Sequence, residues 1–173
     1  MSPRIVACLL VGLTVASATL ATEVSAEEVP ASGRTVVALP RSPFSVRATL
    51  TTSVMPEVQA SDGVSMLVER ECQPQIGGSC SLVTVLEIVV NGRQLFMPRS
   101  LLAGLRNVRV AKLIAEPKTV HLVLRGGDGA EGFVATIVFD RERVLKRFFA
   151  SSLAPNDVLE EIAYRSQKES FDR

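Results

Sequence analysis

Asn91 and Gly92 separate two apolar runs, and this dipeptide sets much of the expected fold. Asn and Gly readily take positive φ at the two central positions of a type I′ turn, which joins antiparallel strands. Residues 81–90 (SLVTVLEIVV) are rich in β-branched side chains, and residues 93–97 continue the pattern until Pro98 stops it. We therefore predict a hairpin formed by residues 81–90 and 93–97.

Short apolar runs separated by turn residues continue on both sides of this hairpin. Hydrophobic residues make up 47% of the chain and charged residues 21%, which excludes an intrinsically disordered protein. We expect an all-β fold, a single antiparallel β-meander domain built as a sandwich, half-barrel or barrel. The further strands are predicted at residues 44–54, 64–71, 108–115, 119–125, 133–140 and 144–151.

Two segments of the second half have a helical pattern. Residues 98–105 (PRSLLAGL) predict a short helical turn. After Pro155, the spacing of Asp157 and Glu160 is that of a capping box, and the apolar residues that follow fit one helical face. An edge strand over residues 159–165 fits the same segment, so the prediction is a short C-terminal helix or an edge strand.

Residues 1–26 have the organisation of a secretory signal peptide. Arg4 precedes an uncharged apolar run at residues 5–15, and small residues favour cleavage after Ala18 or after Ala26. The run is shorter than the roughly 20 residues of a membrane-spanning helix, so an uncleaved anchor is the weaker alternative, and lipidation at Cys8 is weaker still. We expect a periplasmic or secreted protein without a stable membrane anchor after signal cleavage.

The remaining chain divides into an arm, one domain and a tail. A length of 173 residues fits a single domain. Residues 27–43 contain several prolines and a glycine and are expected to form a flexible arm. The single β-rich domain is placed at residues 44–165, and residues 166–173 are expected to be a frayed tail.

Cys72 and Cys80 are the cysteines that remain after the predicted signal peptide is removed. Two cysteines in an exported chain usually pair, and Pro74, Gly77 and Gly78 let the intervening backbone turn back. A redox or zinc role is disfavoured, because the spacing is not Cys-x-x-Cys and the chain has one histidine. We predict a structural disulfide between Cys72 and Cys80.

Few residue types that carry catalysis are present. The single histidine, His121, lies on the strand TVHLVLR, whose apolar face consists of Val120, Leu122 and Leu124. His121 is therefore expected on the more hydrated face of that strand. Because no G-x-S-x-G pattern is present either, we assign no catalytic residue and no cofactor.

Asp128 and Glu131 lie on a loop with four glycines, at residues 126–132. Their carboxylates are weak candidates for a hard metal cation, which prefers six to eight oxygen ligands in the case of calcium. A solvated connection between two hairpins is the favoured interpretation, so no metal is predicted.

Basic residues cluster around the last predicted hairpin, next to Phe148 and Phe149. On a strand, one ring of this pair faces each side. We select as a possible interaction surface Arg143, Lys146, Arg147 and Phe149. An ordinary charged surface that protects sheet edges is the alternative. The net charge of +1 removes the electrostatic argument for binding nucleic acid.

Three segments of the second half carry a family resemblance: NGRQLFMPRSLLAGL, LVLRGGDGAEGFVATIVFDRERVLKR and SSLAPND. Over roughly residues 88–160 the chain resembles small exported bacterial proteins of unassigned function. The resemblance implies export and a β fold, but it implies no activity and no functional residue.

These observations favour an exported, non-enzymatic β-domain that binds another envelope or extracellular molecule, with a protein as the preferred partner. One alternative is an inhibitor or immunity-type protein that inserts the disulfide-closed loop 73–79 into a secreted enzyme. Another is an envelope hydrolase that uses Asp128, Glu131, Asp140 and His121. The oligomeric state is not predicted.

Overall fold

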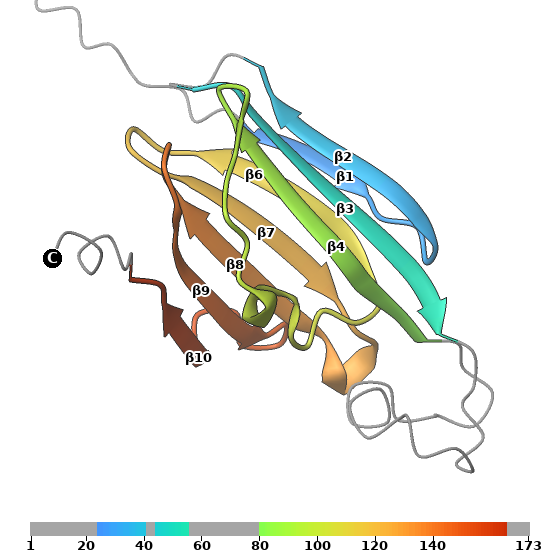
Figure 1. Cartoon of the computed structure of the whole chain (residues 1–173). Helices are drawn as coiled ribbons and strands as arrows, with labels where there is room; N and C mark the ends of the chain where they lie inside the picture. Colours follow the sequence, from blue (N-terminus) through green and yellow to red (C-terminus); the bar gives the residue numbers. More distant parts are fainter. Residues whose placement is uncertain (1–23, 41–43, 56–79, 166–173) are drawn as a thin grey trace, which may run out of the picture.

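The computed structural model describes residues 24–40, 44–55 and 80–165. These residues form two antiparallel sheets that lie face to face (Figure 1). Several predicted features lie outside the described residues: the apolar run of the signal peptide, the strand at 64–71, Cys72, the loop 73–79 and the tail 166–173.

Within the described residues, the larger sheet has the strand order β1-β6-β7-β8-β9-β10 and the smaller sheet the order β2-β3-β4-β5. The larger sheet consists of β1 (Val24–Glu28), β6 (Val108–Ala115), β7 (Val120–Gly126), β8 (Phe133–Phe139), β9 (Val144–Ser151) and β10 (Val158–Ala163). The smaller sheet consists of β2 (Gly33–Leu39), β3 (Val46–Met55), β4 (Cys80–Val90) and β5 (Arg93–Gln94). Two 3₁₀ turns are η1 (Arg99–Leu102) and η2 (Gly129–Glu131). The predicted all-β meander is confirmed in the form of a sandwich, and the described strands do not close into a barrel.

The core lies between the two sheets and is filled by alternate residues of each strand. On β7, Val120, Leu122 and Leu124 are fully buried, which confirms their predicted core face. Side chains of the smaller sheet, such as Leu50 and Ile88, meet them from the other layer. Because sheet side chains alternate between faces, most polar residues of the strands face the outside, and Arg147 on β9 is a buried exception.

The Asn-Gly turn forms as predicted. Asn91 has a φ of 50° and Gly92 a φ of 81°, and Val90 pairs with Arg93 directly before and after the turn. The returning strand is shorter than expected, because β5 ends at Gln94 instead of reaching Met97. Leu95 is buried in the core, and the chain there leaves the smaller sheet.

The expectation that residues 27–43 form a flexible arm is wrong for most of that range. Glu27 and Glu28 belong to β1, and residues 33–39 form β2, which pairs with β3 over its whole length. Val37 and Leu39 enter the core, whereas Val36 between them is exposed. Gly33 and Pro40 flank this strand, whose residues alternate between buried and exposed. The prediction of an arm relied on the glycine and the prolines and not on this alternation.

The C-terminal segment, predicted as a short helix or an edge strand, forms a strand. This strand, β10, is the outermost one of the larger sheet. Glu160 forms an ion pair with Arg147 on the inner face of β9, and Glu161 forms one with Lys146 on its outer face, with 2.8 Å between Nζ and Oε1. Successive residues that find partners on opposite faces favour a strand over a helix.

The segment from Leu95 to Asn107 crosses from the smaller sheet to the larger one and covers the open side between them (Figure 1). The predicted helical turn in this segment is present as η1. Leu95, Leu101 and Leu105 are buried and anchor the crossing to the core. This segment and the strands beside it shape the candidate site.

Candidate interaction site

A groove of about 500 Å³ lies where the chain that leaves β5 passes the β8–β9 turn and the end of β10. Three separate parts of the chain therefore meet there. Its walls are formed by Phe96, Pro98, Glu142, Arg143, Val144, Ala163, Tyr164 and Arg165.

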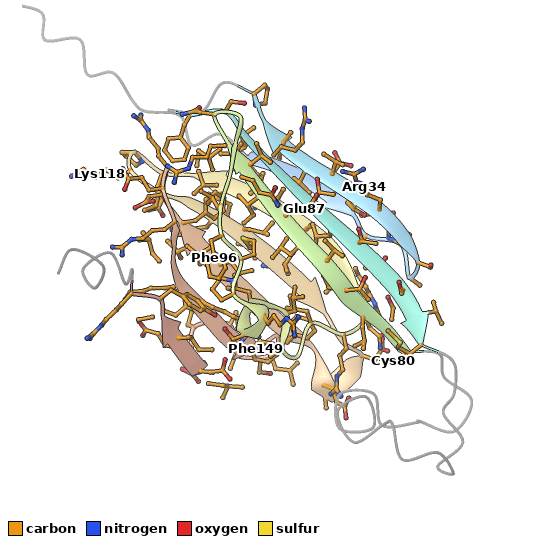
Figure 2. All side chains as sticks on the ribbon, in the orientation of Figure 1. Arg34, Cys80, Glu87, Phe96, Lys118 and Phe149 are labelled. Carbon is orange, nitrogen blue, oxygen red and sulfur yellow. The ribbon has the colours of Figure 1, made fainter. Side chains whose placement is uncertain are left out.

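Phe96 is the most exposed large apolar side chain among the described residues, with 82% of its surface accessible. Its neighbour Leu95 is buried, and adjacent residues of an extended segment point in opposite directions. Anchoring Leu95 in the core therefore directs Phe96 outward (Figure 2). Covering a ring of this size would contribute about 1.5–3 kcal/mol to an association.

The β8–β9 turn holds Arg143 in place beside this ring. The Asp140 carboxylate accepts hydrogen bonds from the backbone N–H groups of Glu142 and Arg143, at 2.7 and 2.9 Å. Asp140 is thus a turn-forming residue, because an Asp side chain that accepts from the backbone two or three residues later stabilises a turn.

Tyr164, one of the wall residues of the groove, is held in place by contacts to two neighbouring elements. Its backbone N–H donates to the Leu145 carbonyl at 2.9 Å, which ties the chain after β10 to β9. Its hydroxyl lies 3.2 Å from the Ser100 hydroxyl, so the ring also connects β10 to η1. The aromatic side of the groove is therefore held by contacts to both neighbouring elements.

The charge of the groove is positive. Arg143 and Arg165 form no ion pair with any other described residue, and Glu142 contributes one carboxylate. Two guanidinium groups that pair with no described carboxylate and lie next to exposed apolar surface favour a ligand that brings carboxylates.

The structure brings only one of the four predicted interaction residues into this groove, namely Arg143. Lys146 lies on the outer face of β9, where it pairs with Glu161 and lies over the Phe148 ring at 5.7 Å. Arg147 is only 2% exposed, and the Phe149 ring stacks on Phe133 with 5.0 Å between centroids. Arg147 therefore acts inside the sandwich, and Phe149 is a partly buried residue packed against the core.

Arg147 ties three elements together. One terminal nitrogen donates to the Glu160 carboxylate of β10, and the other donates to the Ala103 carbonyl in the covering segment. Its guanidinium also lies over the Phe149 ring, 5.2 Å from the centroid. A charge in this position is tolerated because its hydrogen bonds replace part of the lost hydration.

Asp128 and Glu131, the two carboxylates suggested for a metal, are each paired with an arginine. Asp128 pairs with Arg109, and Glu131 with Arg106 at 2.7 Å, so both fasten the glycine-rich loop to the start of β6. No group of three His, Cys, Asp or Glu side chains suited to a metal occurs in the described part of the chain.

His121 lies far along the strand from those carboxylates. It occupies the start of β7, where its Nε2 is 3.6 Å from a Glu116 carboxylate oxygen, whereas Asp128 follows the end of the same strand. It is partly exposed, as predicted. The structure therefore separates His121 from Asp128 and Glu131, whereas Asp140 follows the end of β8 that pairs with the start of β7.

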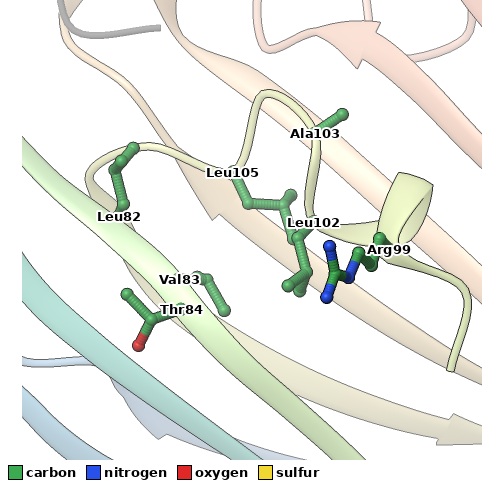
Figure 3. Close-up of a pocket in the computed structure, with 7 residues that line it drawn as sticks. All are labelled: Leu82, Val83, Thr84, Arg99, Leu102, Ala103 and Leu105. Atoms are coloured by element: carbon green, nitrogen blue, oxygen red, sulfur yellow. The ribbon is translucent and has the colours of Figure 1, made fainter. Parts of the chain in front are cut away.

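A second, smaller hollow of about 230 Å³ separates β4 from the covering segment (Figure 3). Its wall is mostly aliphatic, with Leu102 and Leu105 close together and Arg99 as the charged residue. The Val83 N–H donates to the Leu105 carbonyl at 3.1 Å and closes one end. It offers fewer polar anchors than the groove beside Phe96.

Of the groove residues, sequence reasoning selected only Arg143 and missed those that give the groove its aromatic and basic character, among them Phe96, Tyr164 and Arg165. A signal for Phe96 was present, because an aromatic residue directly before Met97-Pro98 has no continuing strand in which to be buried. Nothing local indicated that Arg165 would meet the β8–β9 turn, because that proximity depends on the pairing of β10 with β9.

No protein-family model, no curated protein and no solved structure matches this chain. Function is therefore inferred from the residues and their arrangement. In the described part of the chain, no helix has the length and apolar character needed to cross a membrane.

Proposed function

We propose that this chain is an exported, non-enzymatic β-sandwich domain that binds an acidic segment of an envelope or extracellular protein. The observation that carries the proposal is the groove in which exposed Phe96 lies beside Arg143, Tyr164 and Arg165. Aromatic residues and arginine are the types enriched in protein interfaces and in their energetic centres.

The chemistry of the groove defines the partner segment. Carboxylates on the partner would pair with Arg143 and Arg165, and an apolar side chain would cover Phe96. Because the groove is on the surface and its charges are exposed, electrostatic attraction raises the association rate as well as the affinity. Binding should therefore weaken as the salt concentration rises.

Export is supported by the predicted signal peptide, and the fold predicts where processing occurs. Val24 begins β1 and pairs with Ile114, so cleavage after Ala26 would remove part of a strand. We expect the exported protein to retain Val24, as cleavage after Ala18 allows. The intact mass of the protein recovered from the envelope fraction measures this directly. A mature chain that begins at Glu27 would contradict the expectation.

The groove is tested by a double variant, Phe96→Ala with Arg143→Glu. We expect a partner captured from an envelope extract by the wild-type chain to bind this variant about 30-fold more weakly or worse, because each change removes an interface anchor. Titration of the purified partner, identified by mass spectrometry of the wild-type capture, supplies the affinity.

The matched control is Val36→Ala with Arg34→Glu, which makes the same two kinds of change on the exposed face of β2. This variant should bind the partner as the wild type does. Equal binding by the groove variant, or equal weakening by the control, would contradict the proposed site.

A further inference from the structure

β10 forms one margin of the larger sheet. It pairs with β9 on one side, and no described strand pairs with it on the other. The register shifts between Val158 and Glu160, and the strand is regular from Glu160 to Ala163. A regular strand with one open side is a template for another strand.

The backbone groups that face this open side follow from the pairing with β9. The Tyr164 N–H donates to the Leu145 carbonyl, so its backbone groups point toward β9. Residues alternate along a strand, and the N–H and C=O groups of Glu161 and Ala163 therefore point away from β9. No strand among the described residues pairs with these groups, so an added strand can form hydrogen bonds with them.

The side chains of β10 do not protect this margin in the usual way. Natural edge strands carry lysines, prolines or unpaired charges that prevent association. Here Glu160 and Glu161 are engaged by Arg147 and Lys146, while Val158 and Leu159 are 51% and 70% exposed. The edge strand β10 is thus apolar at its N-terminal end, and the two carboxylates in its middle are neutralised by ion pairs with β9.

We infer that a second copy of this chain pairs with β10, antiparallel and centred on Ile162, so that the two larger sheets become one continuous sheet. This register places Glu161 opposite Ala163 of the second copy, and both have outward-facing backbone groups. Registers centred on Glu160 or Glu161 would set two like carboxylates opposite each other, which is unfavourable.

On the outer face, Glu161 lies diagonally across from both Arg165 and Glu161 of the second copy, and Arg165 is the neighbour of opposite charge. On the inner face, the two Ile162 side chains meet at the twofold axis. The same surface thus supplies both members of each contact, as a closed two-chain assembly requires.

Ala163→Pro tests the pairing with little damage to the fold. The N–H of Ala163 faces the open side, so a proline there removes no hydrogen bond to β9 but blocks an added strand. Sedimentation of the purified chain over a range of concentrations should show a dimer for the wild type and loss of that dimer for the variant. Circular dichroism verifies that the variant is folded.

A pair of cysteine variants tests the register. Ile162 faces itself across the proposed axis as a non-hydrogen-bonded pair, where the Cα atoms are only about 4.5 Å apart. Ile162→Cys should therefore give a covalent dimer on oxidation. Leu159→Cys is the control, because Leu159 is highly exposed yet lies at the register shift, three residues from the proposed axis.

The dimer can be tested separately from the groove, although Ala163 and Arg165 belong to both, because Arg143→Glu should weaken partner binding and leave the dimer intact. A wild-type chain that stays monomeric at every concentration would overturn the inference. So would a dimer that survives Ala163→Pro, or cross-linking of Leu159→Cys that equals that of Ile162→Cys.

Discussion

Arg147→Ala is expected to lower the free energy of unfolding by about 3 kcal/mol. The substitution empties a buried site, leaves the Ala103 carbonyl without its donor, and removes the ion pair that fixes β10 to β9. Urea unfolding, monitored by circular dichroism, measures the loss.

Lys146→Ala is the matched control for this prediction. Lys146 directly precedes Arg147 on β9 and also pairs with a glutamate of β10, but both side chains of this pair are about half exposed. Exposed ion pairs contribute about 0–1 kcal/mol, so this change should have a small effect. Equal destabilisation by the two substitutions would show that Arg147 does not act as the internal tie between elements.

Gly127→Ala should destabilise the fold by about 3 kcal/mol or more. Gly127 is buried and has a φ of 76°, a conformation that disfavours any residue with a Cβ. An added methyl group would also overlap the Glu131 carbonyl across the loop. The backbone of the loop that joins β7 to β8 would have to move.

Gly129→Ala separates the effect of the backbone conformation from the effect of the steric overlap. Gly129 has a φ of 51° but open space around the position of a Cβ, so only the backbone conformation is penalised. This variant should lose about 1 kcal/mol, the usual penalty for a left-handed residue. Thermal unfolding of both glycine variants distinguishes them, and equal losses would argue against the close packing at Gly127.

Much of the sandwich could be predicted because its turns use local chemistry. Asn91-Gly92 produced the expected hairpin, and the strands at residues 108–115 and 144–151 have the predicted bounds. In each case the strand is flanked by residues that end it regardless of the rest of the fold. Period-two alternation likewise assigned the buried face of β7 correctly.

The rest required contacts between distant parts of the chain. The sequence prediction placed β2 in an arm. Its inward residues, Val37 and Leu39, are buried only when β2 pairs with β3 and so joins the sandwich. The choice between strand and helix at β10 depended on Arg147 and Lys146 of β9, which no local pattern relates to Glu160 and Glu161.

The candidate site was predicted least well. Reasoning from the basic cluster selected Arg143, which lines the groove, together with Arg147, which is buried. Arg143 and Arg147 are four residues apart. Arg143 is exposed because it belongs to a turn, whereas Arg147 is buried because it faces inward on β9. The face of a strand decides whether a charged residue binds a partner or holds the fold together.

Hydrogen–deuterium exchange of the complex with the captured partner tests the central claim most directly. Binding in the groove predicts protection in three places: the chain around Phe96, the β8–β9 turn with Arg143, and the residues from Ala163 to Arg165. The same regions should exchange at the free rate in the Phe96→Ala, Arg143→Glu variant. Protection confined to residues 73–79 would instead support the inhibitor-type alternative and contradict the groove as the binding site.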